Sequence, residues 1–136
     1  MKIKLSAIVL LAILPAHARA TPLNPAEAEF LDQLVTAAAV LEQRCTGYEA
    51  NGAGGVQHGA RLLGSADAAM EMIEAFDAAI KAHDGEHYDR IKFRSEVAEA
   101  AGKRFTQVRA DLIGTPKAAC ADYGETSVAR GLLRRY

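Results

Sequence analysis

The chain has 136 residues, of which half are hydrophobic and 6% are aromatic, with no tryptophan, two cysteines and a formal net charge of −1. This length suits a single domain that buries its own core, and the weakly acidic balance argues against a nucleic-acid-binding protein, which usually presents a basic face. Abundant alanine and few aromatic residues favour closely packed helices over a strand-rich sandwich.

Residues 1–20 have the three parts of a secretory signal peptide. Lys2 and Lys4 form a positive start, a short apolar run follows, and Ala18-Arg19-Ala20 places small residues before a cleavage site. The run is shorter than the roughly twenty residues that span a bilayer, which disfavours the alternative of a retained anchor. We therefore expect residues 21–136 to form an exported domain, periplasmic or secreted, with no membrane span after cleavage. It carries 13 basic and 17 acidic residues, a net charge of −4.

The first helix is predicted to open at Asn24-Pro25-Ala26-Glu27. Asn24 suits the cap, Pro25 suits the first helical position, and Glu27 can complete a capping box. Apolar residues then recur at helical spacing and extend the predicted helix to the last of them: Phe30, Leu34, Ala38, Leu41 and Cys45.

Residues 46–55 contain four glycines and are predicted to form a loop, because glycine is costly inside a helix. A short helical piece over 56–63 follows. Ser65 then caps a long helix that ends near Gly85. Its apolar stripe is formed by Ala69, Ile73, Phe76 and Ile80.

A third long helix is predicted to begin within 86–88 and to end at Ile113. Its apolar residues follow a seven-residue repeat, formed by Ile91, Ala98, Phe105 and Leu112. Gly102 interrupts this helix at a cost of about 1 kcal/mol relative to alanine. Such a cost favours a neighbouring helix that needs the space.

Gly114-Thr115-Pro116 predicts the end of one helix and the start of the next, so the last helix is expected over 116–133. Its small side chains predict a central, tightly packed helix: Cys120, Gly124, Ser127 and Gly131. No segment has the alternation that predicts a strand. The predicted fold is therefore all-α, an up-and-down bundle of about four helices.

Cys45 and Cys120 are the two cysteines, and an oxidising compartment favours their pairing. The predicted disulfide ties the first helix to the last and stabilises the fold by roughly 4 kcal/mol in the chain-entropy model. The alternative, a catalytic or redox thiol, lacks the C-x-x-C motif that lowers a thiol pKa.

The segment HDGEHYD, residues 83–89, gathers several side chains that bind metals. His83 and His87 are four residues apart, and Asp84 and Glu86 add oxygen ligands for a zinc, copper or nickel site. Gly85 lies between the histidines, which also fits a solvated turn between two helices. Both interpretations remain open from the sequence.

Other motifs point to no specific chemistry. Met70 and Met72 lie two residues apart, so on a helix their side chains point in different directions and do not bind the same copper ion. The segment NGAGGVQHG lacks the third glycine of a dinucleotide fingerprint. None of the remaining histidines sits in a recognisable nucleophile setting. The sequence therefore predicts no enzyme and no cofactor.

The second cysteine opens the last predicted helix as Cys120-Ala121-Asp122-Tyr123-Gly124, which closes with Gly131-Leu132-Leu133-Arg134. With the signal peptide and Cys45, this arrangement resembles small exported α-helical proteins of proteobacteria that carry one disulfide and are mostly described without a known function. Periplasmic acid-stress chaperones and helical immunity proteins share size and cysteine use. No motif in this chain matches their functional residues.

These observations predict a non-enzymatic periplasmic protein that acts by binding another protein, in a stress, inhibitory or assembly role. The expected contact surface is the 46–58 segment with Tyr48, Asn51 and His58, followed by the 83–89 turn.

One alternative function is the binding of a metal or a small ligand at the 83–89 turn. Another is a hydrolase built on carboxylate pairs such as Glu71 and Glu74, which requires a concave pocket with paired acids.

Overall fold

The computed structural model describes residues 22–136, so the predicted signal peptide lies outside the described residues. Within that range the chain forms five helices and two short strands: α1 (Pro25–Glu42), β1 (Tyr48–Ala50), α2 (Gly52–Leu63), α3 (Ala66–His83), α4 (Ser95–Gly114), α5 (Pro116–Ala129) and β2 (Leu133–Arg135). The helical class is confirmed, and the described chain has five helices where about four were expected.

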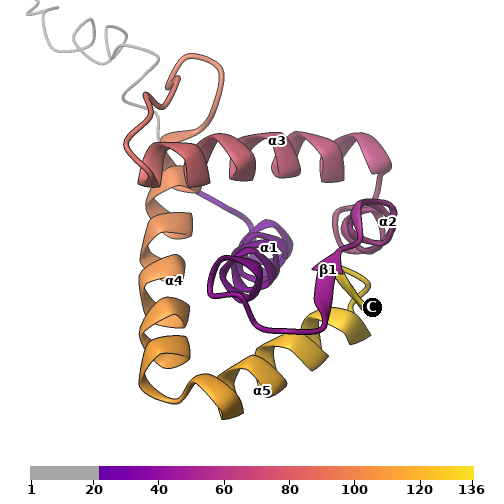
Figure 1. Ribbon diagram of the computed structural model, residues 1–136. Helices are drawn as coiled ribbons and strands as arrows, with labels where there is room; N and C mark the ends of the chain where they lie inside the picture. Colours follow the sequence, from indigo (N-terminus) through magenta and orange to yellow (C-terminus); the bar gives the residue numbers. More distant parts are fainter. Residues whose placement is uncertain (1–21) are drawn as a thin grey trace, which may run out of the picture.

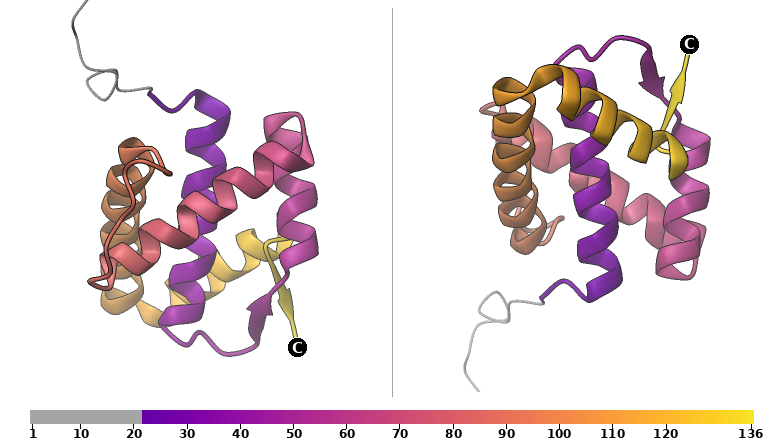
Figure 2. Two further views of the ribbon diagram at one scale, coloured as in Figure 1. Left: turned by 90° about the horizontal axis from the view of Figure 1, so that it is seen from above. Right: turned by 90° about the horizontal axis from the view of Figure 1, so that it is seen from below.

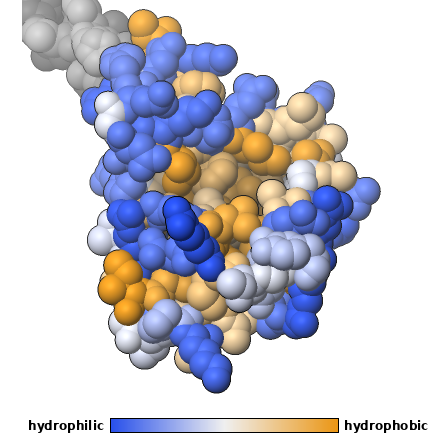
Figure 3. Space-filling model, viewed as in Figure 1, coloured by the Kyte–Doolittle hydropathy of each residue, from blue (hydrophilic) through white to orange (hydrophobic). Residues whose placement is uncertain are grey.

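Helix α1 occupies the centre of the molecule, and the other four helices surround it (Figure 1). Its buried residues face several directions around the helix, as expected for a helix enclosed by neighbours: Phe30, Leu31, Gln33, Leu34, Val35, Thr36, Ala37, Ala39 and Val40. The prediction that the last helix is central was wrong, because α5 buries three residues, Ala119, Gly124 and Ser127. In the same view, hydrophobic residues show in a hollow in the middle of the face, with hydrophilic residues on parts of its edge (Figure 3).

The predicted disulfide is confirmed, although its position relative to α1 differs from the prediction. Helix α1 begins with the expected capping box at Asn24 and Glu27 but ends at Glu42, and Arg44 adopts a left-handed conformation with φ +56°. Cys45 therefore lies beyond the helix, buried, and bonds to Cys120 of α5. The expected extension of the helix to Cys45 was wrong because this turn redirects the chain toward β1.

The predicted 46–55 loop is shorter than expected, because residues 48–50 form β1 and residues 52–55 are the first turn of helix α2. Asn51 caps α2 by accepting a hydrogen bond from the Gly54 N–H at 3.0 Å, and α2 starts at Gly52. Gly59 lies against Phe30 of α1, where a Cβ atom would stand 2.5 Å from the ring. The close approach of α1 and α2 requires glycine there, which offsets its cost inside a helix.

The C-terminus adds a short antiparallel sheet that the sequence did not predict. Helix α5 ends at Ala129 rather than continuing to Leu133, and Gly131 turns the chain with φ +78°. Strand β2 then pairs with β1, with Glu49 opposite Arg134, and the two side chains form an ion pair at 2.7 Å. Strands of three residues are too short to show an alternating pattern.

Helix α3 starts as predicted, with the Ser65 side chain accepting a hydrogen bond from the Ala68 N–H at 3.1 Å.

Helix α4, however, starts at Ser95, so residues 84–94 form a loop and Ile91 is fully exposed rather than buried. The buried face of α4 is offset by one residue from part of the predicted repeat: Val97, Ala101, Phe105, Val108 and Leu112. No atom lies within 4 Å of a Cβ built at Gly102, so the expected neighbouring helix is not there.

Candidate binding groove

A groove of about 640 Å³ lies between the start of α1, the end of α2, the first half of α3 and the start of α4. Figure 2 (left) shows these four helix ends around one side of the molecule, with the 84–94 loop running from the end of α3 back to α4. The groove is lined by Asn24, Ala26, Glu27, Leu62, Leu63, Ala68, Glu71, Met72, Glu74, Ala75, Lys92, Phe93, Arg94 and Val97.

The floor of the groove is apolar and belongs to the core. Met72 and Val97 are buried, and Leu62, Leu63 and Phe93 are partly buried against the same core. Each of these residues comes from an amphipathic helix or from the loop beside it. Their apolar side chains face the core and also form the bottom of the groove. An apolar floor with polar edges is the usual composition of a ligand or protein contact site.

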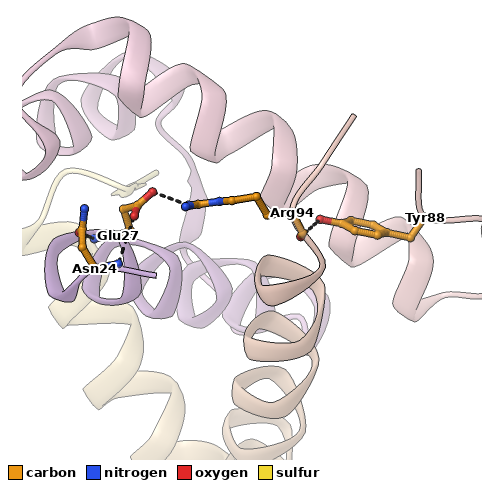
Figure 4. A network of polar contacts seen from close by, with 4 residues as sticks. All are labelled: Asn24, Glu27, Tyr88 and Arg94. Atoms are coloured by element: carbon orange, nitrogen blue, oxygen red, sulfur yellow. Dashed lines mark hydrogen bonds and ion pairs between the residues drawn. The ribbon is translucent and has the colours of Figure 1, made fainter. Parts of the chain in front are cut away.

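One wall is fixed by a network of hydrogen bonds and an ion pair around Arg94 (Figure 4). The Arg94 guanidinium pairs with Glu27, whose other oxygen accepts the Asn24 N–H at 3.1 Å. The Tyr88 hydroxyl donates to the carbonyl oxygen of Arg94 at 2.6 Å. This network ties the loop before α4 to the first turn of α1.

The network also determines the charge of its acid. Burial raises the pKa of Glu27, but the hydrogen bonds from Arg94 and from the Asn24 N–H outweigh it, so the pKa lies below its usual value. Glu27 is therefore ionised at neutral pH. Burial, reinforced by the charge of Glu96, raises the pKa of Tyr88, which stays a neutral hydrogen-bond donor.

The opposite wall is acidic. Glu71 and Glu74 are exposed on α3, and within residues 22–136 neither side chain makes an ion pair or a hydrogen bond. Lys92 lies on the loop side, with its Nζ atom 5.2 Å from the centre of the Phe93 ring. Apart from the Glu27–Arg94 pair, the groove thus carries two carboxylates and one ammonium group.

A second hollow of about 330 Å³ continues the groove along α3. It shares Glu74, Lys92 and Phe93 with the first and is otherwise lined by Asp77, Ala78, Lys81, Glu86 and His87. Asp77 and Lys81 form an ion pair at 2.8 Å. The hydrogen bond from Lys81 to Asp77 raises the pKa of Lys81, which stays charged. The combined groove runs from the first turn of α1 to the 83–89 turn.

The structure brings together two of the four residues of the predicted metal site. Glu86 and His87 line the second hollow, whereas His83 and Asp84 do not. The His83 ring packs against Phe105 of α4, with ring centres 4.9 Å apart and ring planes tilted by 55°, and Asp84 is the C-cap of α3. Among residues 22–136 no group of three or more histidine, cysteine, aspartate or glutamate side chains is arranged to hold a metal ion.

All three residues of the predicted partner surface have intramolecular roles. Tyr48 donates to Glu125 at 2.6 Å, a bond that raises the pKa of the tyrosine, and Asn51 caps α2. His58 Nε2 lies 2.5 Å from Gln33 Oε1 on α1.

Burial, together with the positive charges of Arg61 and Arg130, lowers the pKa of His58, so the ring is neutral at pH 7.

The residues that define the groove were mostly missed by sequence reasoning. Glu71 and Glu74 were noted as a carboxylate pair on a helix exterior, but the apolar floor and Arg94 were not singled out. No local signal joins Arg94 to Glu27, because 67 positions separate them. The useful signal was the spacing of Glu71 and Glu74. Residues three positions apart lie on the same side of a helix, so the sequence indicated that both carboxylates share one side of this amphipathic helix.

No protein-family model matches this chain, and neither a curated protein nor a solved structure does. The resemblance to exported single-disulfide helical proteins therefore stays a prediction. None of the helices in residues 22–136 is both long and apolar enough to cross a membrane.

Proposed function

We propose that this is an exported, non-enzymatic protein that acts by binding another protein, and that the groove along α3 is its contact surface. The observation that carries the proposal is the combination of a buried apolar floor with two carboxylates, Glu71 and Glu74, that have no partner within the described residues. Contact sites between proteins typically have an apolar centre and a polar rim.

The walls of the groove are held in place before any partner arrives. The Glu27–Arg94 pair fixes the loop side to α1, and the Cys45–Cys120 bond ties the end of α1 to α5. A preorganised surface loses less conformational entropy on binding, which favours affinity. The disulfide also supports export, because such bonds persist mainly in oxidising compartments.

The hydrolase alternative required a concave pocket with paired acids, and Glu71 and Glu74 do line the groove. Both come from the same side of α3, however, whereas the two carboxyl groups of a glycosidase flank the bond that breaks. The third acid, Glu27, is kept ionised by Arg94 and is a poor proton donor at neutral pH. This arrangement favours binding over acid–base catalysis.

A photo-crosslinking side chain at position 71 tests the proposal in the natural host. We expect it to form an adduct with one discrete protein, whereas the same group at Lys117, exposed on α5 away from the groove, forms none. Adducts of equal yield from both positions, or from position 117 alone, would contradict the groove as the contact surface.

The metal-binding alternative rests on Glu86 and His87, which line one hollow, although no three histidine, cysteine, aspartate or glutamate side chains within residues 22–136 are arranged to hold an ion. It predicts a native mass that includes a metal ion, which chelation removes. It also predicts that the double substitution His83→Ala/His87→Ala abolishes stoichiometric metal uptake. Unchanged uptake by that variant would exclude the 83–89 turn as the site.

A further inference from the structure

The tip of the 84–94 loop presents an apolar residue between two basic ones. Ile91 is fully exposed, and Arg90 and Lys92 on either side of it are exposed as well. Within residues 22–136 neither basic side chain has an acidic partner. Single exposed apolar residues are common on protein surfaces, so the position of this one beside the groove is what matters.

The tip is held away from its own groove by hydrogen bonds within the loop. Asp89 Oδ1 accepts the N–H groups of Ile91 and Lys92 at 3.0 and 3.2 Å, and the Asp89 carbonyl accepts the Phe93 N–H at 2.9 Å. These bonds form a tight turn that fixes the direction of the loop. Ile91 therefore stays in solvent although Lys92 and Phe93, its near neighbours in sequence, line the groove.

The groove has the chemistry that complements this tip. Its apolar floor suits the Ile91 side chain, and the unpaired carboxylates of Glu71 and Glu74 suit the charge of Arg90. An apolar residue that enters an apolar depression and is flanked by opposite charges is a common way to anchor one protein on another.

We propose that the partner of this groove is a second copy of the same chain, and that the two copies exchange their loop tips. Ile91 of one protomer enters the groove of the other, and its Arg90, which lines neither hollow of its own chain, faces Glu71 and Glu74 across the contact. Lys92, the residue after Ile91, lines the groove, so the tip lies at the edge of the groove. A two-fold axis between tip and groove then places each tip opposite the groove of the other protomer. This inference rests on the proposed function of the groove as a protein-binding surface.

The net charge of each chain opposes the formation of this dimer. Each exported chain carries a net charge of −4, and two such chains repel one another at long range. The local attraction between loop tip and α3 therefore decides whether they associate. Because these charges are exposed, added salt screens the attraction and we expect it to weaken the dimer.

Sedimentation or light scattering of the purified 21–136 chain over a range of concentrations tests the inference. We expect a reversible dimer, weakened about tenfold or more by Ile91→Asp at the tip and by Glu71→Lys/Glu74→Lys in the groove. Ile113→Asp is the matched control, since Ile113 is another exposed isoleucine but lies at the end of α4 outside the groove. The dissociation constant of this control should be unchanged.

Mixing the two weakened variants gives a sharper test. The Ile91→Asp protomer keeps an intact groove and the Glu71→Lys/Glu74→Lys protomer keeps an intact tip, so a mixed dimer has one complete contact. We expect the mixture to associate more tightly than either variant alone. A global loss of folding would give no such recovery, and circular dichroism of each variant checks for it.

A chain that stays monomeric up to about 1 mM, or an Ile113→Asp variant as impaired as Ile91→Asp, overturns the inference. The crosslinking experiment separates this failure from failure of the proposed function. An adduct from position 71 with a different protein, combined with a monomeric chain, overturns the self-association and supports the groove as a contact surface. An adduct with twice the mass of the chain supports both.

Discussion

The ring of Tyr48 occupies the space that any side chain at Gly124 would need. A Cβ atom at position 124 would stand 2.4 Å from Tyr48 Cζ, and the Tyr48 hydroxyl donates a hydrogen bond at 2.6 Å to Glu125, the next residue of α5. Glu125 also pairs with Arg135 of β2. This contact joins the segment after α1, helix α5 and the C-terminal strand.

Replacing Gly124 with alanine should therefore force the tyrosine out of its position. We expect Gly124→Ala to lower the free energy of unfolding by about 1–3 kcal/mol, the usual cost of overpacking. Chemical denaturation followed by circular dichroism measures this change. Gly102→Ala is the control, since a Cβ built there has no atom within 4 Å beyond the adjacent backbone of its own helix and alanine is the better helix former by about 1 kcal/mol. A destabilised Gly102→Ala protein would show that space is not what distinguishes the two sites.

Breaking the disulfide should destabilise the protein without changing its helical content under native conditions. The bond closes a loop across 75 positions, and the chain-entropy model gives about 4 kcal/mol for a loop of that size. The Cys45→Ala/Cys120→Ala protein should therefore unfold at a lower denaturant concentration. Thiol labelling of the native protein, isolated without reductant, should find both cysteines unreactive, and labelling of either one would contradict the pairing in the cell.

The ion pair between Glu27 and Arg94 should make stability depend on pH in the acid range. Because the folded pKa of Glu27 lies below its unfolded value, the ionised form is favoured by folding. The stabilisation is present above the unfolded pKa of about 4.3 and is lost as the pH falls through the lower, folded value. We expect Arg94→Ala to reduce the pH dependence of the unfolding free energy between about pH 6 and pH 3. An identical profile in the variant would mean that other acids dominate this range.

His58 should weaken the fold at mildly acid pH for a different reason. Its folded pKa is lowered from 6.5 by burial and by Arg61 and Arg130, against a smaller opposing effect of Glu29. The unfolded chain therefore binds the proton more readily, and stability falls as the pH drops below about 6.5. His58→Gln removes this titration while keeping an amide that can bond to Gln33. We expect its unfolding free energy to vary less than that of the natural chain between about pH 7 and pH 5.

A nuclear magnetic resonance titration of the His58 ring checks the direction of that shift independently. A His58 pKa above 6.5 would contradict the predicted sign, whatever the stability measurements show. The bond to Gln33 links α2 to α1, so the two helices are where a loss of packing should first appear.

Features that depend on neighbours in sequence were predicted well. The cap at Asn24, the cap at Ser65 and the restart at Thr115-Pro116 all lie where expected. Each depends on side chains within four positions of the helix end, so the sequence pattern contains the whole interaction. The disulfide was predictable for a different reason, because two cysteines allow one pairing.

The wrong boundaries have a common cause in contacts between distant residues. Helix α2 includes three of the four glycines that predicted a loop, because Gly59 packs on Phe30 and the capping Asn51 starts the helix early. Helix α4 starts late because Tyr88 and Arg94 hold the preceding segment as a loop against α1. Ile91 continued the apolar repeat by coincidence and is exposed.

The sequence by itself determined the helical class, three helix starts and the pairing of Cys45 with Cys120. These follow from capping, periodicity and cysteine number, which act over a few residues or over the whole chain irrespective of shape. The tertiary structure alone decided that α1 is central and that Leu62, Met72 and Phe93 floor one groove beside Glu71 and Glu74. A groove is made by side chains that folding brings together, and no local pattern records which distant residues will meet.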